Sequence, residues 1–177
     1  FRQPKYSYYM FMAQRPAVKN DRNAGSGPMV YIAHEMTPFS GKDVTVYSNC
    51  DEVRLTFNKG GKTYTYKKDK NRPGMPSPVI TFPDVYDFMV DKAFSRTQKQ
   101  DDVYLLAEGL IDGKVVATNK VVPARRPEKI LLWMDNEGTD LKADGSDFVT
   151  VVAAVADKNG NIKRLNNYNI RFSIEGE

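Results

Sequence analysis

The chain has 177 residues, of which 41% are hydrophobic and 27% are charged, and this balance permits an ordinary globular core. No stretch reaches the ~18 apolar residues that a membrane-spanning helix needs, which excludes a helical membrane span. The net charge of +4 is spread along the chain and is weak support for a polyanionic partner. The single cysteine, Cys50, cannot form an internal disulfide, so both a reducing compartment and export remain open.

Residues 4–15 are predicted to form a helix, because Pro4 suits a first helical turn and Pro16 closes the segment. The segment leaves almost no polar face, so we expect it to pack against other structure, including structure outside this sequence. Residues 17–28 have the composition of a linker. The sequence opens without an initiator methionine or a signal peptide, and we interpret it as a piece of a longer protein.

From Met29 the hydrophobic period changes to two, which predicts β-strands. Four strands are expected at residues 29–36, 43–49, 52–57 and 62–68. The third of them is apolar on one face and polar on the other, as in a sheet with one wet face. The apolar face carries Val53, Leu55 and Phe57, and the polar face carries Arg54, Thr56 and Asn58. Residues 58–61 supply a turn after this strand.

Residues 67–102 interrupt the regular pattern with four prolines and many charges. We expect a long excursion that contains one short strand at residues 78–82 and a helical turn near residues 84–94. A loop of this length inside a compact domain usually has a function or holds an inserted element.

Alternation returns at residues 102–122, where Asp112-Gly113 predicts a hairpin turn. Three more strands are expected at residues 129–134, 148–157 and 169–177. In the last of these, Ile170, Phe172 and Ile174 share a face.

Short strands with turns about every 8–12 residues predict an all-β fold with two Ig-like β-sandwiches in tandem, preceded by a short helix. The expected domains are residues 1–28 for the helix and linker, 29–124 for the first sandwich, and 125–177 for the second. The last region is short for a sandwich, so we expect it to be incomplete and marginal alone.

Candidates for catalysis are few. His34 is the one histidine, so a Ser-His-Asp triad, a Cys-His pair or a zinc site would have to share it. We expect His34 at the surface or in an interface, in an edge strand beside Glu35. Cys50 is expected to be a small buried side chain, since neither a cationic environment nor a helix N-terminus is indicated around it.

The carboxylates also favour structural roles. Most aspartates lie in predicted turns, where their side chains bond to the backbone, and these are Asp112, Asp144, Asp147 and Asp157. The pairs Asp51-Glu52 and Asp101-Asp102 precede strands and are interpreted as solvated flanks. A catalytic carboxylate pair, as glycosidases use, is therefore not expected in this chain.

Two further patterns resemble ligand sites. Residues 157–162 read DKNGNI, like the start of a calcium loop, but Ile162 and Tyr168 stand where that loop needs glycine and glutamate. A hairpin turn is favoured there. Residues 64–72 mix tyrosines with basic residues, which can bind single-stranded nucleic acid. No RNA-binding glycine-aromatic motif accompanies them, and a solvated strand end is favoured.

Three segments resemble parts of family 2 glycoside hydrolases, in the same order. FRQPKYSYYMFMAQRP at the start resembles the last helix of their catalytic barrel. DVTVYSNCDEVRLTFN and LLAEGLIDGKVVATNKVVPARRPEKI are similar to the Ig-like module that follows the barrel. LKADGSDFVTVVAAVADKNGN resembles the next, invasin-like module.

This resemblance implies a non-catalytic C-terminal accessory region of a bacterial β-galactosidase-like enzyme that hydrolyses β-glycosidic bonds. The implied partners are the catalytic barrel of the same polypeptide, a second copy in a homo-oligomer, and carbohydrate through the parent enzyme. The family's catalytic glutamates lie in the barrel and match no position here, so no catalytic residue, metal or cofactor is expected. The resemblance also implies a periplasmic or extracellular location.

Met75, Tyr86 and Phe88 are the candidate substrate-rim contacts, because they are apolar residues of the long excursion at residues 67–102. Two other functions stay open, a carbohydrate-binding module and a cell-surface adhesion module. Trp133 lies in an apolar strand and is predicted to be core, which disfavours an aromatic sugar platform. The apolar helix disfavours an adhesion stalk, which has no use for it. Nucleic-acid binding would predict steeply salt-dependent association.

Overall fold

The computed structural model describes residues 4–20, 22, 25–97, 100–135, 140–142 and 144–175. The chain divides into two compact units, unit 1 (Phe1–Pro123) and unit 2 (Ala124–Glu177). In the part of the chain that the structure describes, no helix has the length and apolar character that crossing a membrane requires.

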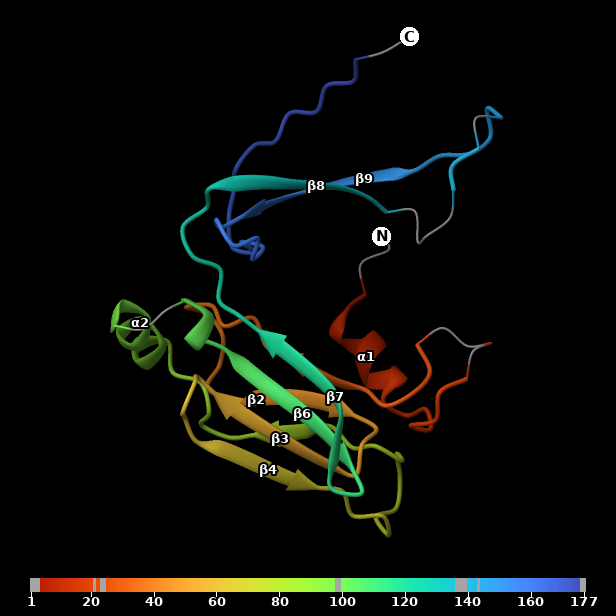
Figure 1. Cartoon of the computed structure of the whole chain (residues 1–177), viewed down its shortest axis with the longest axis vertical. Coiled ribbons are helices and arrows are strands. Elements are labelled where there is room, and N and C mark those ends of the chain that lie inside the picture. The colour runs from red at the N-terminus through yellow and green to blue at the C-terminus, as the bar shows by residue number, and fades with distance from the viewer. Residues whose placement is uncertain are drawn as a thin grey trace. The chain divides into compact units, whose positions relative to one another are not determined.

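Unit 1 contains two antiparallel sheets (Figure 1). The three-stranded sheet has the order β1-β2-β5 and consists of β1 (Val30–Ala33), β2 (Val44–Ser48) and β5 (Ile80–Phe82). The four-stranded sheet has the order β4-β3-β6-β7 and consists of β3 (Glu52–Phe57), β4 (Thr63–Lys67), β6 (Leu105–Ile111) and β7 (Lys114–Val121).

One hydrophobic cluster joins the two sheets and makes unit 1 a β-sandwich. Both sheets contribute to it through alternate residues, among them Ile32, Val44, Val46, Val53, Leu55, Ile80, Phe82 and Leu105. Burying each such side chain stabilises the fold by about 1.5–3 kcal/mol relative to leaving it in water. The prediction of an all-β fold is confirmed, and the inward face predicted for β3 holds because Val53 and Leu55 are fully buried.

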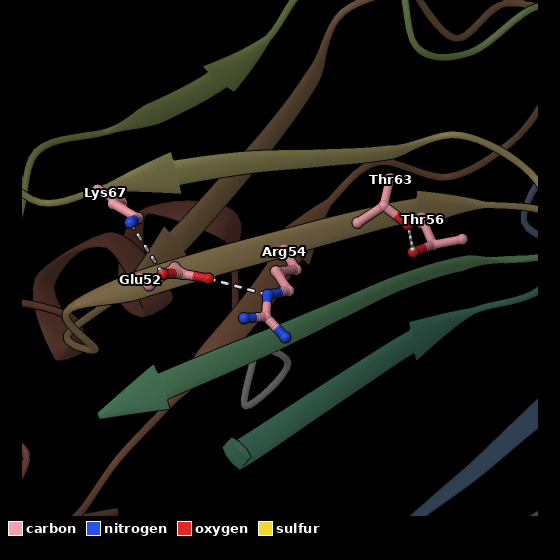
Figure 2. A network of polar contacts seen from close by, with 5 residues as sticks. All are labelled: Glu52, Arg54, Thr56, Thr63 and Lys67. Atoms are coloured by element: carbon pink, nitrogen blue, oxygen red, sulfur yellow. Dashed lines mark hydrogen bonds and ion pairs between the residues drawn. The ribbon is translucent and has the colours of Figure 1, made fainter. Parts of the chain in front are cut away.

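The polar face of β3 is also where the sequence placed it, and Figure 2 shows its contacts with β4. Glu52 accepts a hydrogen bond from Arg54 Nε at 2.8 Å, and Lys67 Nζ lies 3.9 Å from the other oxygen of the same carboxylate. The hydroxyls of Thr56 and Thr63 are 3.1 Å apart across the strand pair. Exposed pairs of this kind contribute little to stability.

The prediction for Asn58 is wrong, because its side chain is buried. Asn58 ends β3 with a φ of 62°, and this left-handed conformation turns its side chain away from the alternation of the strand. Its Oδ1 then accepts the backbone N–H of Tyr104 at 3.1 Å, while its own N–H donates to the Tyr104 carbonyl at 2.7 Å. Asn58 therefore fastens the β3–β4 turn to the start of β6.

The excursion at residues 67–102 is partly ordered structure. It holds β5, helix α2 (Phe88–Thr97) and a short 3₁₀ helix, η1 (Gln100–Asp102). The helix starts later than predicted because Asp87 Oδ1 accepts the N–H groups of Met89 and Val90, at 2.8 and 3.2 Å, and so caps it. The β6–β7 hairpin turn is confirmed, with positive φ at both Asp112 and Gly113.

A close backbone approach fixes one glycine in the sandwich. The register of β6 shifts between Gly109 and Leu110, which marks a β-bulge. A Cβ on Gly109 would lie 2.6 Å from the Sγ of Cys50, so only glycine leaves room for this cysteine. Cys50 is buried, as predicted, and burial raises the pKa of its thiol.

Unit 2 contributes one two-stranded antiparallel sheet within its described residues, made of β8 (Lys129–Asp135) and β9 (Thr150–Ala156). The strand predicted at residues 169–177 is wrong for the described residues 169–175, which form no strand. The core prediction for Trp133 is also wrong, since this side chain is 38% exposed. Among the described residues of unit 2 there is no second sheet to cover it.

Candidate functional site

Helix α1 (Tyr6–Met12) is shorter than predicted, and seven residues are too few for a helix to be stable in isolation. Its last turn is closed by backbone bonds from Ala13 to Tyr9 and from Gln14 to Phe11, each 3.0 Å long. Pro16 ends the segment, as the sequence predicted. The helix must therefore be held by contacts with the sandwich.

Those contacts form a helix junction, which we define as Tyr6, Tyr9 and Gln14 on the helix side and Tyr31, Glu35, Asn49 and Ser77 on the sandwich side. Tyr31 lies on the outer face of β1, because Val30 and Ile32 point into the core. Tyr9 stacks on Tyr31 with ring centroids 3.5 Å apart and an interplanar angle of 7°. The Tyr6 hydroxyl donates to Glu35 Oε1 at 2.6 Å.

The far end of the helix is tied to the loop before β5. Gln14 Nε2 donates to the carbonyl of Ser77 at 2.7 Å, and Gln14 Oε1 accepts the N–H of Ser77 at 3.0 Å. One amide thus satisfies both backbone groups of Ser77, which is itself buried. The same nitrogen also donates to the carbonyl of Met10 at 3.0 Å, so the side chain is fixed from both sides.

Asn49 fastens the linker that follows the helix. Its Nδ2 donates to the carbonyls of Arg15 and Gly27, at 3.2 and 3.0 Å, and its Oδ1 accepts the N–H of Met29 at 2.8 Å. Asn49 is only 7% exposed, its bond to Gly27 is buried, and its bonds to Arg15 and Met29 are partly buried. The neighbouring Ser48 Oγ donates to the Met29 carbonyl at 2.8 Å. The helix, the linker and β2 are therefore joined at one place.

The opposite side of α1 is apolar and open to solvent within unit 1. Phe11 is 67% exposed and Tyr8 is 50% exposed. Large aromatic side chains of this kind are enriched in protein contacts and costly to leave in water. The expectation that the helix packs against other structure is thus met on one side by the sandwich, and the other side is available for binding.

The one histidine of the chain lies inside unit 1. His34, which was predicted at the surface or in an interface, is buried within unit 1, and its ring lies beside that of Tyr86 at a centroid distance of 4.7 Å. No group of three or more histidine, cysteine, aspartate or glutamate side chains that could hold a metal ion occurs among the described residues. The helix junction is an arrangement that holds one segment of the chain in place against another.

Asp157 is used by the turn that was compared with a calcium loop. It is fully buried, and its two oxygens accept the N–H groups of Arg125, Asn159 and Asn161, at 3.0, 3.0 and 2.9 Å. Asn161 Nδ2 also donates to Asp157 Oδ2 at 3.1 Å, so the carboxylate holds the turn together. The turn predicted for this segment is confirmed.

The three predicted rim residues have different environments. Tyr86 is 1% exposed and belongs to the sandwich core, where burial raises the pKa of its hydroxyl well above the ordinary value. Phe88 is half-buried and packs against the same core. Met75 is 47% exposed in the loop before β5. The structure thus brings Tyr86 and Phe88 to the core and leaves Met75 at the surface.

Sequence reasoning missed the residues that build the helix junction. Gln14 lies in the segment predicted as a helix and Asn49 in a segment predicted as a strand. The sequence around a single glutamine or asparagine does not indicate which groups its amide will contact. Tyr31 and Glu35 were placed in a strand but not on a particular face. The useful signal was the apolar character of residues 4–15, which required a packing partner.

Comparisons with known proteins agree with this architecture. The chain matches no known protein-family model. It is 31% identical over 185 aligned residues to a β-galactosidase from Thermoanaerobacter pseudethanolicus, and the match covers 100% of this chain and 23% of that enzyme. The chain resembles a small part of a bacterial β-galactosidase. The resemblance predicted from the three sequence segments is confirmed, and most of the relative's length lies outside this chain.

Solved structures show the same fold in part of larger enzymes. A β-glucuronidase from glycoside hydrolase family 2 aligns with a TM-score of 0.61 and 23% identity, over 91% of this chain and 14% of that one. A family 2 member from Bacteroides cellulosilyticus aligns with a TM-score of 0.50 and 24% identity, over 75% of this chain and 15% of that one. At these identities the likeness supports the fold alone.

The first prediction concerns Asn49. Replacing Asn49 by alanine leaves three backbone groups without their partner, of which the Gly27 carbonyl is buried, so we expect the free energy of unfolding of unit 1 to fall by about 1–3 kcal/mol. Urea titration followed by far-ultraviolet circular dichroism measures the loss. The control is Asn71→Ala at an exposed position, with an expected change within about 0.5 kcal/mol. Equal effects of the two changes would contradict the role given to Asn49.

The second prediction concerns the pH dependence of stability through His34. Burial lowers the pKa of His34 below its ordinary value of 6.5, against the opposing effects of the Gly41 carbonyl and the Glu35 charge. The unfolded chain therefore binds a proton more readily than the folded one. The contribution of His34 is complete above about pH 6.5 and is lost as the pH falls through the folded pKa.

Urea titrations between pH 5 and pH 8, about the ordinary histidine pKa, test this prediction. His34→Gln should lose stability at pH 8 and should show a shallower decline on acidification than the unsubstituted chain. An identical pH slope in the two proteins would contradict it.

Proposed function

We propose that this chain is a non-catalytic accessory region of a β-galactosidase-like glycoside hydrolase that braces the catalytic part of the same polypeptide. The observation that supports the proposal most is the two-sided character of α1. One side is fixed to the sandwich by the helix junction, and the other side presents Phe11 and Tyr8. A rigid link of this kind fixes where the sandwich stands relative to the structure that contacts the helix.

The contacts of two carboxylates, Asp51 and Glu52, also support an accessory role. The carboxylates at the start of β3 are in ion pairs, Glu52 with Arg54 and Asp51 with Lys70. Each of these carboxylates is thus in contact with a basic side chain of unit 1. In this proposal the glycosidic bond is cleaved by residues of the parent enzyme outside this chain.

The proposal extends to the setting of the parent enzyme. Contacts in a homo-oligomer, a carbohydrate substrate and a periplasmic or extracellular location follow from the family resemblance. The exposure of Trp133 removes burial as an argument against a carbohydrate-binding module. Bracing remains the better proposal because it accounts for the helix junction, which sugar binding by unit 2 would leave without a role.

The third prediction tests bracing with Phe11→Ala. In the 177-residue chain alone, Phe11 is largely exposed, so the change should alter the free energy of unfolding by less than about 0.5 kcal/mol. In the full-length enzyme the same change removes a covered aromatic contact and should lower the midpoint of thermal unfolding of the catalytic part, measured by calorimetry.

The matched control for Phe11 is Val115→Ala, at another exposed apolar position. It should leave both proteins unchanged. An unchanged unfolding midpoint for Phe11→Ala in the full-length enzyme would contradict bracing through this face. Hydrolysis of nitrophenyl β-galactoside by the isolated chain, abolished by changing one of its own carboxylates, would contradict the non-catalytic assignment.

The fourth prediction concerns the substrate rim, for which Met75 is the exposed candidate. Met75→Ala should raise the KM of the full-length enzyme for an oligosaccharide while leaving kcat within twofold, because a binding contact is lost and the reacting groups are untouched. Deleting the whole excursion is not a usable test, since Ile80, Phe82 and Tyr86 belong to the core. Unchanged KM and kcat would remove Met75 from the rim.

A further inference from the structure

The loop between β1 and β2, residues 34–43, presents an aromatic side chain from an unusually well-fixed backbone. Its base is held by His34, whose Nδ1 accepts the N–H of Met36 at 3.1 Å and whose Nε2 donates to the Gly41 carbonyl at 2.9 Å. The ring therefore bridges both sides of the loop. This geometry requires the neutral ring, because a proton on Nδ1 would face the N–H of Met36.

The buried residue beside it is held in a strained conformation. Met36 has a φ of 49°, which a residue with a long side chain rarely adopts, and its side chain is 3% exposed. A left-handed backbone at such a residue persists only where the surroundings impose it, and such positions cluster at functional sites. The core contact of Met36 and the bridge made by His34 are those surroundings.

The tip of the loop is closed by hydroxyl groups. The Thr37 N–H donates to Ser40 Oγ at 3.0 Å, the Ser40 N–H donates to the Thr37 carbonyl at 3.1 Å, and the two hydroxyls are 3.0 Å apart. The Tyr86 hydroxyl reaches the same Thr37 carbonyl from the core at 3.4 Å. Between these residues, Phe39 stands 86% exposed. A fixed loop with an aromatic tip loses little conformational entropy on binding.

The loop also contacts the start of α1. Glu35, which follows His34, accepts the hydroxyl of Tyr6 at the start of the helix at 2.6 Å. The helix exposes Tyr8 and Phe11. The loop that carries Phe39 and the helix that carries Tyr8 and Phe11 are thus linked by a direct contact between Glu35 and Tyr6.

We propose that Phe39 is a second anchor, which inserts into an apolar pocket of the catalytic part of the same polypeptide. This inference rests on the proposed function, because it takes the same partner that covers the open face of α1. The match to the β-galactosidase spans 23% of that enzyme, so a large body of chain is available to supply the pocket. The aromatic tip, the pre-set backbone and the contact with the helix are features of an interface anchor.

Cysteine labelling measures the coverage of Phe39 directly. Cys50→Ala removes the buried thiol, and Phe39→Cys, Phe11→Cys and Lys114→Cys are each made in that background, with Lys114 as the exposed turn control. Each variant reacts with a maleimide as the 177-residue chain and as the full-length enzyme. Peptide mass mapping gives the rate at each position. We expect the rate at position 39 to fall at least tenfold in the full-length enzyme and the rate at position 114 to stay unchanged.

The outcomes separate this inference from the proposed function. Slow labelling at position 39 in the full-length enzyme, with fast labelling in the isolated chain at every concentration, supports the anchor. Fast labelling at position 39 with slow labelling at position 11 overturns the anchor and leaves bracing by α1 intact. Fast labelling at both positions overturns both proposals. Protection of position 39 in the isolated chain that grows with its concentration assigns the loop to a second copy and also overturns the inference.

Discussion

The attachment of a seven-residue helix to one face of a β-sandwich is the constraint on which the rest of the structure depends. A helix of this length has too few internal hydrogen bonds to exist alone, so its conformation is imposed by the helix junction. Three kinds of interaction act together there. The first is the stacking of Tyr9 on Tyr31, and the second is the pair of hydrogen bonds between the Gln14 amide and the Ser77 backbone. The third is the set of hydrogen bonds that Asn49 makes with the backbone of the linker. Each fixes a different part of the segment before β1.

This attachment also explains why the segment is so rich in aromatic residues. Tyr9 stacks on Tyr31 of the sandwich, and Tyr8 and Phe11 remain exposed on the other side of the helix. A helix that packed only against the sandwich would have a polar face toward solvent. The chain is similar to a small part of a β-galactosidase, and in the bracing role that we propose the rest of such an enzyme covers the exposed side of the helix.

Period-two alternation predicted the strands of the sandwich well, because each of them has one face in the core and one in water. The residues that failed are those whose environment is set by something other than alternation. Asn58 is turned inward by a left-handed backbone. His34 is turned inward because its ring is hydrogen-bonded to Met36 and Gly41 on the two sides of the β1–β2 loop. Trp133 lies in a strand that looks like core but belongs to a two-stranded sheet without a covering layer among the described residues.

The candidate site could be predicted only in outline. The apolar character of residues 4–15 required a partner, but the partner on the sandwich is a set of polar and aromatic groups scattered over four segments. No local pattern links Gln14 to Ser77 or Asn49 to Gly27, because those contacts depend on how the sheets stack. The burial of Tyr86 likewise follows from the fold of the excursion around β5 and not from its sequence.

Hydrogen exchange of the isolated chain, resolved by nuclear magnetic resonance, tests the central claim most directly. If the helix junction holds α1 to the sandwich, the amide of Ala13 should exchange far more slowly than in an unstructured peptide. Nuclear Overhauser contacts should also connect the rings of Tyr9 and Tyr31. Free exchange at Ala13 and no contact between these rings, in a chain whose β3 and β6 amides remain protected, would contradict the account.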